Sequence, residues 1–350
     1  MSSLPLSALA ALALAAVMPA VALAAPARAA AKPTAPAEAR APYPAREDVR
    51  AFIAEMQQEH GFAAADLERW LAAAKFQPRI VELMNRPVLD PPKWFEYSPQ
   101  FLSAERIEAG LAFWTTHAAA LARAETATGV PAEIIVAIIG VETYYGRVTG
   151  SHRVIDALAT LAFDYPRRSV FFRGELKEFL LLAREQGFSP LAAKGSYAGA
   201  MGLPQFMPGS YRRYAVDFDA RAGVDLWASA EDAVGSVANY FVRHDWKPGQ
   251  PVMAKAYVEP GQRDAVMRRL DGGLAERRPL IAWNLDGVTT APLPVDVEPD
   301  PIGLLLLEES ASASSTWMVF HNFYVITRYN RSRLYATSVW RLAQALRARR

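Results

Sequence analysis

The most constraining feature of this chain is an uncharged, apolar run that lies between Glu133 and Glu142. The run contains only Ile, Val, Ala and Gly. A helix that is apolar on most of its faces must be buried. Pro131 suits the first position of such a helix and Gly146 suits its C-terminal stop. We therefore expect a core helix from Pro131 to Tyr145, with Glu142 near its C-terminal end.

The position of Glu142 predicts an unusual carboxyl group. Burial and the negative end of the helix dipole both disfavour the carboxylate, so the pKa of Glu142 should be raised. A carboxyl group that stays protonated near neutral pH can act as a general acid toward a glycosidic oxygen. The alternative is a glutamate that merely reaches solvent at the helix end, and the helix by itself favours this alternative.

The remaining pattern predicts a mainly α protein of the α+β class. Apolar residues recur at helical spacing over residues 47–124, 158–163, 171–186, 231–244 and 332–349. Residues 195–209 are rich in Gly and Pro, which predicts a structured loop. Strand signals occur at residues 252–257, 280–283, 302–307 and 316–326, separated by turn-forming residues. These short runs predict a small β-rich subdomain.

The N-terminus predicts export. Residues 4–25 are almost continuously apolar, and A-x-A sites follow between Ala22 and Ala29, so residues 1–30 resemble a secretory signal peptide cleaved near Ala24–Ala30. The alternative is an uncleaved membrane anchor. The Pro/Ala-rich residues 31–46 predict a flexible linker. We expect a periplasmic protein.

Composition excludes several classes of protein and site. The chain has no cysteine, which excludes disulfides, Cys-zinc sites, thiol nucleophiles and lipoprotein attachment. Its five histidines are scattered, which argues against a His-rich metal site. Lys and Arg total 38 against 36 Asp and Glu, a balance that argues against nucleic acid as a partner.

Four separated motifs favour the interpretation of Glu142 as a catalytic residue. Glu142 begins the sequence ETYYGR, residues 164–168 read DYPRR, residues 195–208 read GSYAGAMGLPQFMP, and residues 329–332 read YNRS. Together they resemble the membrane-bound lytic murein transglycosylase B family, and the resemblance extends from about Ala51 to the C-terminus. It implies a lysozyme-like helical catalytic core.

The resemblance also assigns residue roles. Glu142 matches the single catalytic acid/base of the family. The matching substrate-binding positions are Ser196 and Gln205 in the cleft, Tyr329 and Asn330 facing the glutamate, Tyr335 beside them, Arg167 and Arg168 contacting the glycan or its peptide, and Tyr97 and Tyr240 in the groove.

Most of these positions also have a purely structural interpretation. Tyr97 and Tyr240 could be core tyrosines, and Arg167 and Arg168 could form a solvated turn. The polar residues could act only within their own segments: Ser196 as a helix cap, Gln205 as a tie within the loop, and Asn330 as a cap of the final helix.

A single carboxyl group limits the mechanism. Glycosidases normally pair an acid with a second carboxylate, and Asp164, in its Asp-Tyr-Pro turn, is interpreted as a cap. The resemblance implies an intramolecular reaction: Glu142 protonates the MurNAc–GlcNAc bond and then deprotonates the C6 hydroxyl, giving a 1,6-anhydro product. The alternatives are a muramidase of the same fold and a non-catalytic peptidoglycan-binding scaffold.

One loop resembles a calcium site of some family members. Asp217, Asp219 and Asp232 could supply oxygen ligands, but an EF-hand requires an oxygen ligand at its fifth position and Gly at its sixth. Here Arg221 and Ala222 occupy those positions. We expect calcium binding to be weak or lost, with Arg221 pairing with Asp217 or Asp219 in place of the ion. No cofactor is expected to be required.

The expected organisation follows from these assignments. We predict an N-terminal helical domain at residues 47–112, a catalytic core at 113–250, a β-rich subdomain at 251–318, and a C-terminal strand and helix at 319–350 that complete the core. The protein is expected to be a monomer that binds peptidoglycan glycan strands. Proteins of cell-wall synthesis or division are candidate partners.

Overall fold

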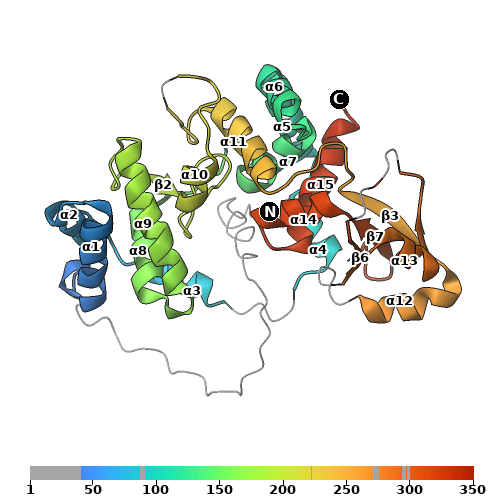
Figure 1. Ribbon diagram of the computed structural model, residues 1–350, viewed down its shortest axis with the longest axis horizontal. Helices are drawn as coiled ribbons and strands as arrows, with labels where there is room; N and C mark the ends of the chain where they lie inside the picture. The colour runs from blue at the N-terminus through green and yellow to red at the C-terminus, as the bar shows by residue number, and fades with distance from the viewer. Residues whose placement is uncertain (1–40, 87–90, 222, 271–275, 294–296, 298–299) are drawn as a thin grey trace, which may run out of the picture.

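The structure is a computed structural model that describes residues 41–350, except 87–90, 222, 271–275, 294–296 and 298–299. The predicted signal peptide and most of the predicted linker lie outside the described residues. The expected α+β class is confirmed: helices form most of the molecule, and a small antiparallel sheet lies at one end (Figure 1).

The N-terminal part is built from short helices, α1 to α4. Their bounds, with two 3₁₀ turns, are η3 Tyr43–Ala45, α1 Glu47–His60, α2 Ala64–Ala73, α3 Pro78–Met84, α4 Trp94–Tyr97 and η4 Ser98–Gln100. Asp156 and Thr160 of α8 accept hydrogen bonds from the backbone N–H groups of Lys75 and Gln77. These bonds hold the chain between α2 and α3 against the centre of the molecule.

The end of the predicted linker is packed instead of free. Tyr43 is buried, and its hydroxyl donates to Asp164 at the end of α8. Arg46 donates to the other oxygen of the same carboxylate at 2.5 Å. Asp164 therefore anchors the N-terminal segment, whereas the sequence suggested a cap.

The central helices surround α7 (Ala132–Thr143), whose apolar residues are buried as predicted. The other central elements are α5 Ala104–Thr116, α6 Ala118–Thr128, β1 His152–Arg153, α8 Val154–Asp164, η5 Pro166–Arg168, α9 Ser169–Glu185, β2 Lys194–Gly195, α10 Pro208–Tyr214 and α11 Ala230–Arg243. Helices α5, α6, α11 and α15 all contact α7. One hydrophobic core joins these helices to the N-terminal ones.

The sheet has its own smaller core. Its strand order is β4-β6-β7-β3-β5, and all neighbours are antiparallel. The elements here are β3 Met253–Val258, η6 Pro260–Gln262, α12 Arg263–Arg269, β4 Arg277–Arg278, α13 Leu280–Leu285, β5 Val288–Thr290, β6 Ile302–Glu308 and β7 Ser314–Val319. A second hydrophobic cluster that includes Val266, Trp283 and Met318 fills this unit.

Two of the predicted strands are wrong, wholly or in part. Leu280 to Trp283 begins helix α13, in which Trp283 is buried and its indole donates to the carbonyl of Ile302. The run from Thr316 to Ile326 is a strand only as far as Val319 and then continues as α14 (His321–Tyr329). Short apolar runs do not distinguish a strand from a buried helix.

The last helix returns the chain to the centre. α15 (Arg333–Arg347) packs along α7, as its position beside the central helices in Figure 1 illustrates. This packing brings residues of the C-terminal segment to the end of α7. The domain boundaries expected from the sequence stay a prediction.

Within the described residues, no single helix is long and apolar enough to cross a membrane, although the bent pair α6 and α7 would qualify together by length and composition alone.

Candidate active site

Helix α7 ends earlier than the sequence predicted. Pro131 is the N-cap instead of the first helical residue, and the helix stops at Thr143. Tyr144 and Tyr145 both adopt left-handed conformations, with φ of 52° and 59°. Such conformations are costly for residues other than glycine, and they persist where surrounding contacts hold them. This strained turn directly follows Glu142.

Arg106 of α5 contacts the turn at Tyr144 and Tyr145 and helps to hold its conformation. Its Nη1 donates to the carbonyl of Gly140 in the last turn of α7, and its guanidinium carbon lies 4.5 Å from the centroid of the Tyr144 ring. The guanidinium carbon of Arg147 lies 4.6 Å from the centroid of the same ring. Tyr144 is therefore fixed by two guanidinium groups.

Two glycines make room for the second tyrosine of the turn. A Cβ added at Gly140 would lie 2.6 Å from Oη and Cζ of Tyr145, and one added at Gly110 would lie 2.4 Å from Oη. Any side chain there would collide with the phenol. The phenol of Tyr145 thus occupies a space that exists only because both positions are glycine.

Thr143 connects the end of α7 to the Gly/Pro-rich loop of residues 195–209. Its hydroxyl donates to the carbonyl of Leu203 at 2.9 Å. The hydroxyl of Tyr329 donates to the neighbouring carbonyl of Pro204 at 2.6 Å. The loop is therefore held beside Glu142 from two directions.

The Glu142 side chain is partly exposed but lies among protein atoms on most sides. Its Oε1 accepts a hydrogen bond of 2.5 Å from the hydroxyl of Tyr335. Burial raises the pKa of Glu142 to about 7, although the Tyr335 bond acts in the opposite direction. The carboxyl group is therefore partly protonated at neutral pH.

Four of the predicted tyrosines gather around this carboxyl group. The ring of Tyr329 stacks on that of Tyr335 with centroids 6.5 Å apart. The ring centroid of Tyr240 lies 4.8 Å from that of Tyr329. Burial, and then the charge of Glu142, raise the pKa values of Tyr97, Tyr329 and Tyr335. These phenols therefore stay protonated and can act as hydrogen-bond donors.

Two polar atoms in this region have no partner within the described part of the chain. One is the hydroxyl of Tyr97, and the other is Oδ1 of Asn330. Asn330 does not cap the final helix, because Ser332 does so by accepting from the N–H of Tyr335. A buried polar atom without a partner is costly, so both side chains have hydrogen-bonding capacity that the protein itself leaves unused.

Ser196 and Gln205 are mainly engaged within their own loop. The hydroxyl of Ser196 accepts from the N–H groups of Ala198 and Ala200. The Gln205 amide donates to the carbonyls of Thr149 and Gly202, and its backbone is left-handed at φ 51°. Both residues are buried, and each shapes the loop whatever else it contacts.

The structure does not bring Arg167 and Arg168 into the tyrosine group. Both lie on η5, where Arg167 is exposed and Arg168 packs over the ring of Phe171 at 4.4 Å. Among the described residues, neither arginine contacts Glu142 or its tyrosines. Their predicted role in substrate binding stays a prediction.

Sequence reasoning missed three positioning residues: Arg106, Thr143 and Tyr145. Thr143 and Tyr145 lie within the motif that begins at Glu142, so their position was a usable signal. Arg106 had none, because its contact with Gly140 joins two helices that are distant in sequence. Asp164 accepts hydrogen bonds from Tyr43 and Arg46 of the N-terminal segment, which gives this carboxylate a structural role.

The calcium-like loop gathers three carboxylates, and its binding of a cation stays a prediction. Carboxylate oxygens of Asp217, Asp219 and Asp232 lie within 4.8 Å of one another. However, every carboxylate oxygen of the three already accepts a hydrogen bond from the loop itself.

The predicted side-chain pairing of Arg221 in this loop is wrong. Its backbone N–H binds Asp217 and Asp219, and in the described structure its guanidinium makes no ion pair with either. A main-chain donor reaches both carboxylates because the loop folds back on itself over these few residues.

Comparison with known proteins agrees with this geometry. Residues 44–344 match the family described as "Transglycosylase SLT domain". The chain is 41% identical over 309 residues to membrane-bound lytic murein transglycosylase B of Escherichia coli, covering 84% of this chain and 81% of that protein.

Two solved structures from Pseudomonas aeruginosa are also similar. Soluble lytic transglycosylase SltB1 is 45% identical with a TM-score of 0.80, covering 86% of this chain and 99% of that one. SltB3 in complex with NAG-anhNAM-pentapeptide is 31% identical with a TM-score of 0.74, covering 86% and 79%. The lysozyme-like core and the family resemblance are thereby confirmed, and the chain belongs to the SLT-domain family of lytic murein transglycosylases, enzymes that cleave peptidoglycan.

Proposed function

We propose that this enzyme cleaves the β-1,4 bond between MurNAc and GlcNAc and forms a 1,6-anhydroMurNAc end, with Glu142 as its single acid/base. The observation that carries the proposal is the state of the Glu142 carboxyl group. Its pKa is about 7, it is partly exposed, and Tyr335 orients it. A group that titrates near neutral pH can both give and take a proton there.

The reaction proceeds in two proton transfers. Glu142 donates its proton to the glycosidic oxygen, the bond between C1 of MurNAc and that oxygen breaks, and GlcNAc leaves with a free hydroxyl. The C6 hydroxyl of the same MurNAc then attacks C1, and the Glu142 carboxylate accepts its proton. The acid is regenerated and no water is consumed, so a second carboxylate is unnecessary.

The polar groups around Glu142 support substrate binding. Oδ1 of Asn330 and the hydroxyl of Tyr97 are buried and unpartnered, so a shift of either side chain toward a bound glycan would let Asn330 accept and Tyr97 donate a hydrogen bond. Tyr329, Tyr335 and Tyr240 form a rigid aromatic wall, because their hydroxyls are engaged and their rings are packed. A rigid wall of this kind can hold the reacting sugar in position beside Glu142.

The substrate and location follow from the same assignment. The SltB3 complex contains a NAG-anhNAM-pentapeptide, which supports peptidoglycan glycan strands as the substrate of this chain. We place the enzyme in the periplasm as a monomer that needs no metal ion for catalysis. Proteins of cell-wall synthesis or division are its candidate partners.

Product analysis tests the reaction. Digestion of purified sacculi should release muropeptides that are lighter by one water than hydrolysis products and lack a reducing end. Reducing-end products would identify a muramidase of the same fold. Equal activity of Glu142→Gln and the wild type would refute the proposed acid.

A further inference from the structure

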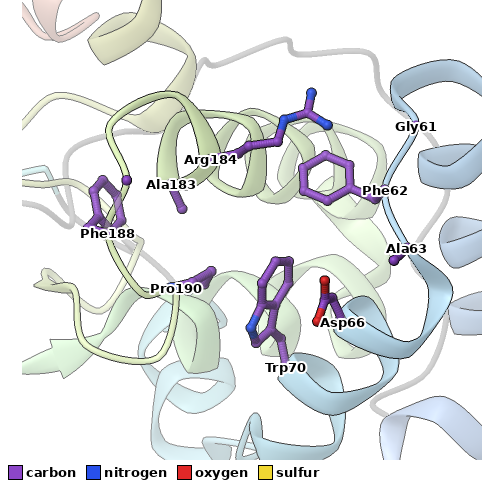
Figure 2. Close-up of a pocket in the computed structure, with 10 residues that line it drawn as sticks. Gly61, Phe62, Ala63, Asp66, Trp70, Ala183, Arg184, Phe188 and Pro190 are labelled. Carbon is purple, nitrogen blue, oxygen red and sulfur yellow. The ribbon is translucent and has the colours of Figure 1, made fainter.

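A hollow of about 360 Å³ lies away from Glu142, where the N-terminal helices meet the C-terminal end of α9. Figure 2 shows its walls: Phe62, Asp66 and Trp70 come from α2 and the turn before it, and Arg184, Phe188 and Pro190 come from α9 and the segment after it. None of these residues takes part in the Glu142 site. Its volume is in the range of small-ligand pockets, about 300–1,000 Å³.

Arg184 is held in place at one side of the hollow. Its Nη1 donates to the carbonyl of His60 at 2.7 Å, and its guanidinium carbon lies 4.2 Å from the centroid of the Phe62 ring. In the part of the chain that the structure describes, no carboxylate pairs with it. A guanidinium that is ordered and pairs with no carboxylate can donate hydrogen bonds to a bound carboxylate, since little side-chain freedom remains to be lost on binding.

The opposite side carries an aromatic surface and an anion. Trp70 is half-buried and meets Phe62 edge to face, with ring centroids 6.2 Å apart. Asp66 lies beside Trp70 and faces the hollow across from Arg184 (Figure 2). Its carboxylate is partly exposed and pairs only with the exposed Arg69 within the described structure, a contact that contributes little.

This combination selects a particular chemistry. Arg184 suits a carboxylate, Asp66 suits an ammonium group, and the aromatic surface between them suits small apolar groups such as methyls. A neutral N-acetylhexosamine would leave both charges unused. We propose that the hollow binds the free end of a peptidoglycan stem peptide, which carries carboxylates, an amino group on its diamino acid and alanine methyls.

This inference rests on the proposed function, because that function supplies a peptide-bearing polymer as substrate. A peptide site remote from Glu142 would give the enzyme a second point of attachment to the same network. Two linked contacts raise the overall affinity even when each is weak. The enzyme would then favour strands that carry stems over bare glycan.

The test uses the full chain and a free tetrapeptide stem that contains diaminopimelate. Binding is followed by NMR through the indole N–H signal of Trp70, assigned with Trp70→Phe. We expect the peptide to shift this signal, and Arg184→Gln to weaken the affinity at least fivefold. Ala63→Phe narrows the exposed rim of the hollow without removing a contact, and should weaken the affinity for the peptide to a similar extent. Arg79→Gln, an exposed position on α3, is the matched control and should match the wild type.

Three results would overturn the proposal. They are a Trp70 signal that the peptide does not move, an affinity unchanged in both pocket variants, and a chitooligosaccharide that shifts the signal as strongly as the peptide. Activity of the same variants on peptide-free glycan strands is measured in parallel and should equal that of the wild type. Loss of activity in the wild type itself would count against the proposed function and not against the pocket.

Discussion

Tyr335 donates a 2.5 Å hydrogen bond to the carboxyl group of Glu142, although 193 residues separate the two in sequence. The bond joins α15, near the C-terminus, to the last turn of α7. It orients the carboxyl group and limits how far burial raises its pKa. The proton affinity of Glu142 is thus set mainly by burial and is reduced by a contact between two distant parts of the chain.

The pH dependence of the reaction should follow Glu142. The pKa of this group is about 7, and the first step needs its protonated form, so turnover should fall as the pH rises through about 7. The Tyr335 hydroxyl favours the carboxylate, so Tyr335→Phe should raise the pKa and move this fall to higher pH. The measurement is the initial rate of sacculus solubilisation from pH 5 to 9. If the rate of Tyr335→Phe falls over the same pH range as that of the wild type, the role assigned to the Tyr335–Glu142 hydrogen bond is contradicted.

Glu142→Gln should stabilise the protein at alkaline pH. The folded state holds the Glu142 proton up to about pH 7, whereas the unfolded state releases it near the ordinary value of 4.5. The wild type therefore loses about 3 kcal/mol of stability as the pH rises between these two values, since one pKa unit corresponds to about 1.4 kcal/mol. Gln cannot titrate and avoids this loss. Urea unfolding should show a larger advantage for the variant at pH 8 than at pH 5. An equal difference in unfolding free energy between the variant and the wild type at both pH values would mean that burial does not shift the pKa of Glu142.

Gly140→Ala should damage the turn after Glu142. The added methyl would collide with the Tyr145 phenol, which Gly110 confines from the other side. We expect a loss of about 1–3 kcal/mol in the free energy of unfolding together with reduced activity. Gly174→Ala in α9 is the matched control, because nothing lies within 4 Å of its added Cβ. The control should gain up to about 1 kcal/mol. A Gly140→Ala variant as stable and active as the wild type would show that the space left for the Tyr145 phenol by Gly140 is not needed.

Calcium should have little effect on the native chain. The carboxylates of the 217–232 loop already bind the loop's own N–H groups and Ser229, and Arg221 occupies a ligand position. Micromolar calcium should leave Tm unchanged. Arg221→Asp adds a carboxylate at that position and should make Tm rise with calcium. A calcium-dependent rise in the wild type would refute the expectation.

The sequence was most informative where periodicity and local chemistry agree. The apolar run before Glu142 predicted a buried helix and a raised pKa, because eight consecutive apolar residues leave no solvent-facing side. It placed the C-terminal end of α7 too late, because the left-handed Tyr144 and Tyr145 depend on Arg106 and on two glycines in different helices. Local propensity does not contain such contacts.

The β-rich subdomain shows a second limit. The run at Leu280 buries Trp283 but leaves Ile281 exposed, whereas the run at Phe323 is largely buried. Pro279 and the buried Asn322 mark the starts of helices there. The side chain of Asn322 binds the backbone of Lys247 and Gln250, which fixes where α14 begins. The grouping of Tyr97, Tyr240, Tyr329 and Tyr335 came from the family resemblance. For Tyr97 and Tyr240, spacing in the sequence alone favoured ordinary core tyrosines.

The most direct test of the account is mass spectrometry of muropeptides released from purified sacculi by the wild type and by Glu142→Gln. The account predicts 1,6-anhydromuropeptides from the wild type and none from the variant, whose folding is verified by urea unfolding. Reducing-end products from the wild type, or anhydro products from Glu142→Gln at the wild-type rate, would contradict it.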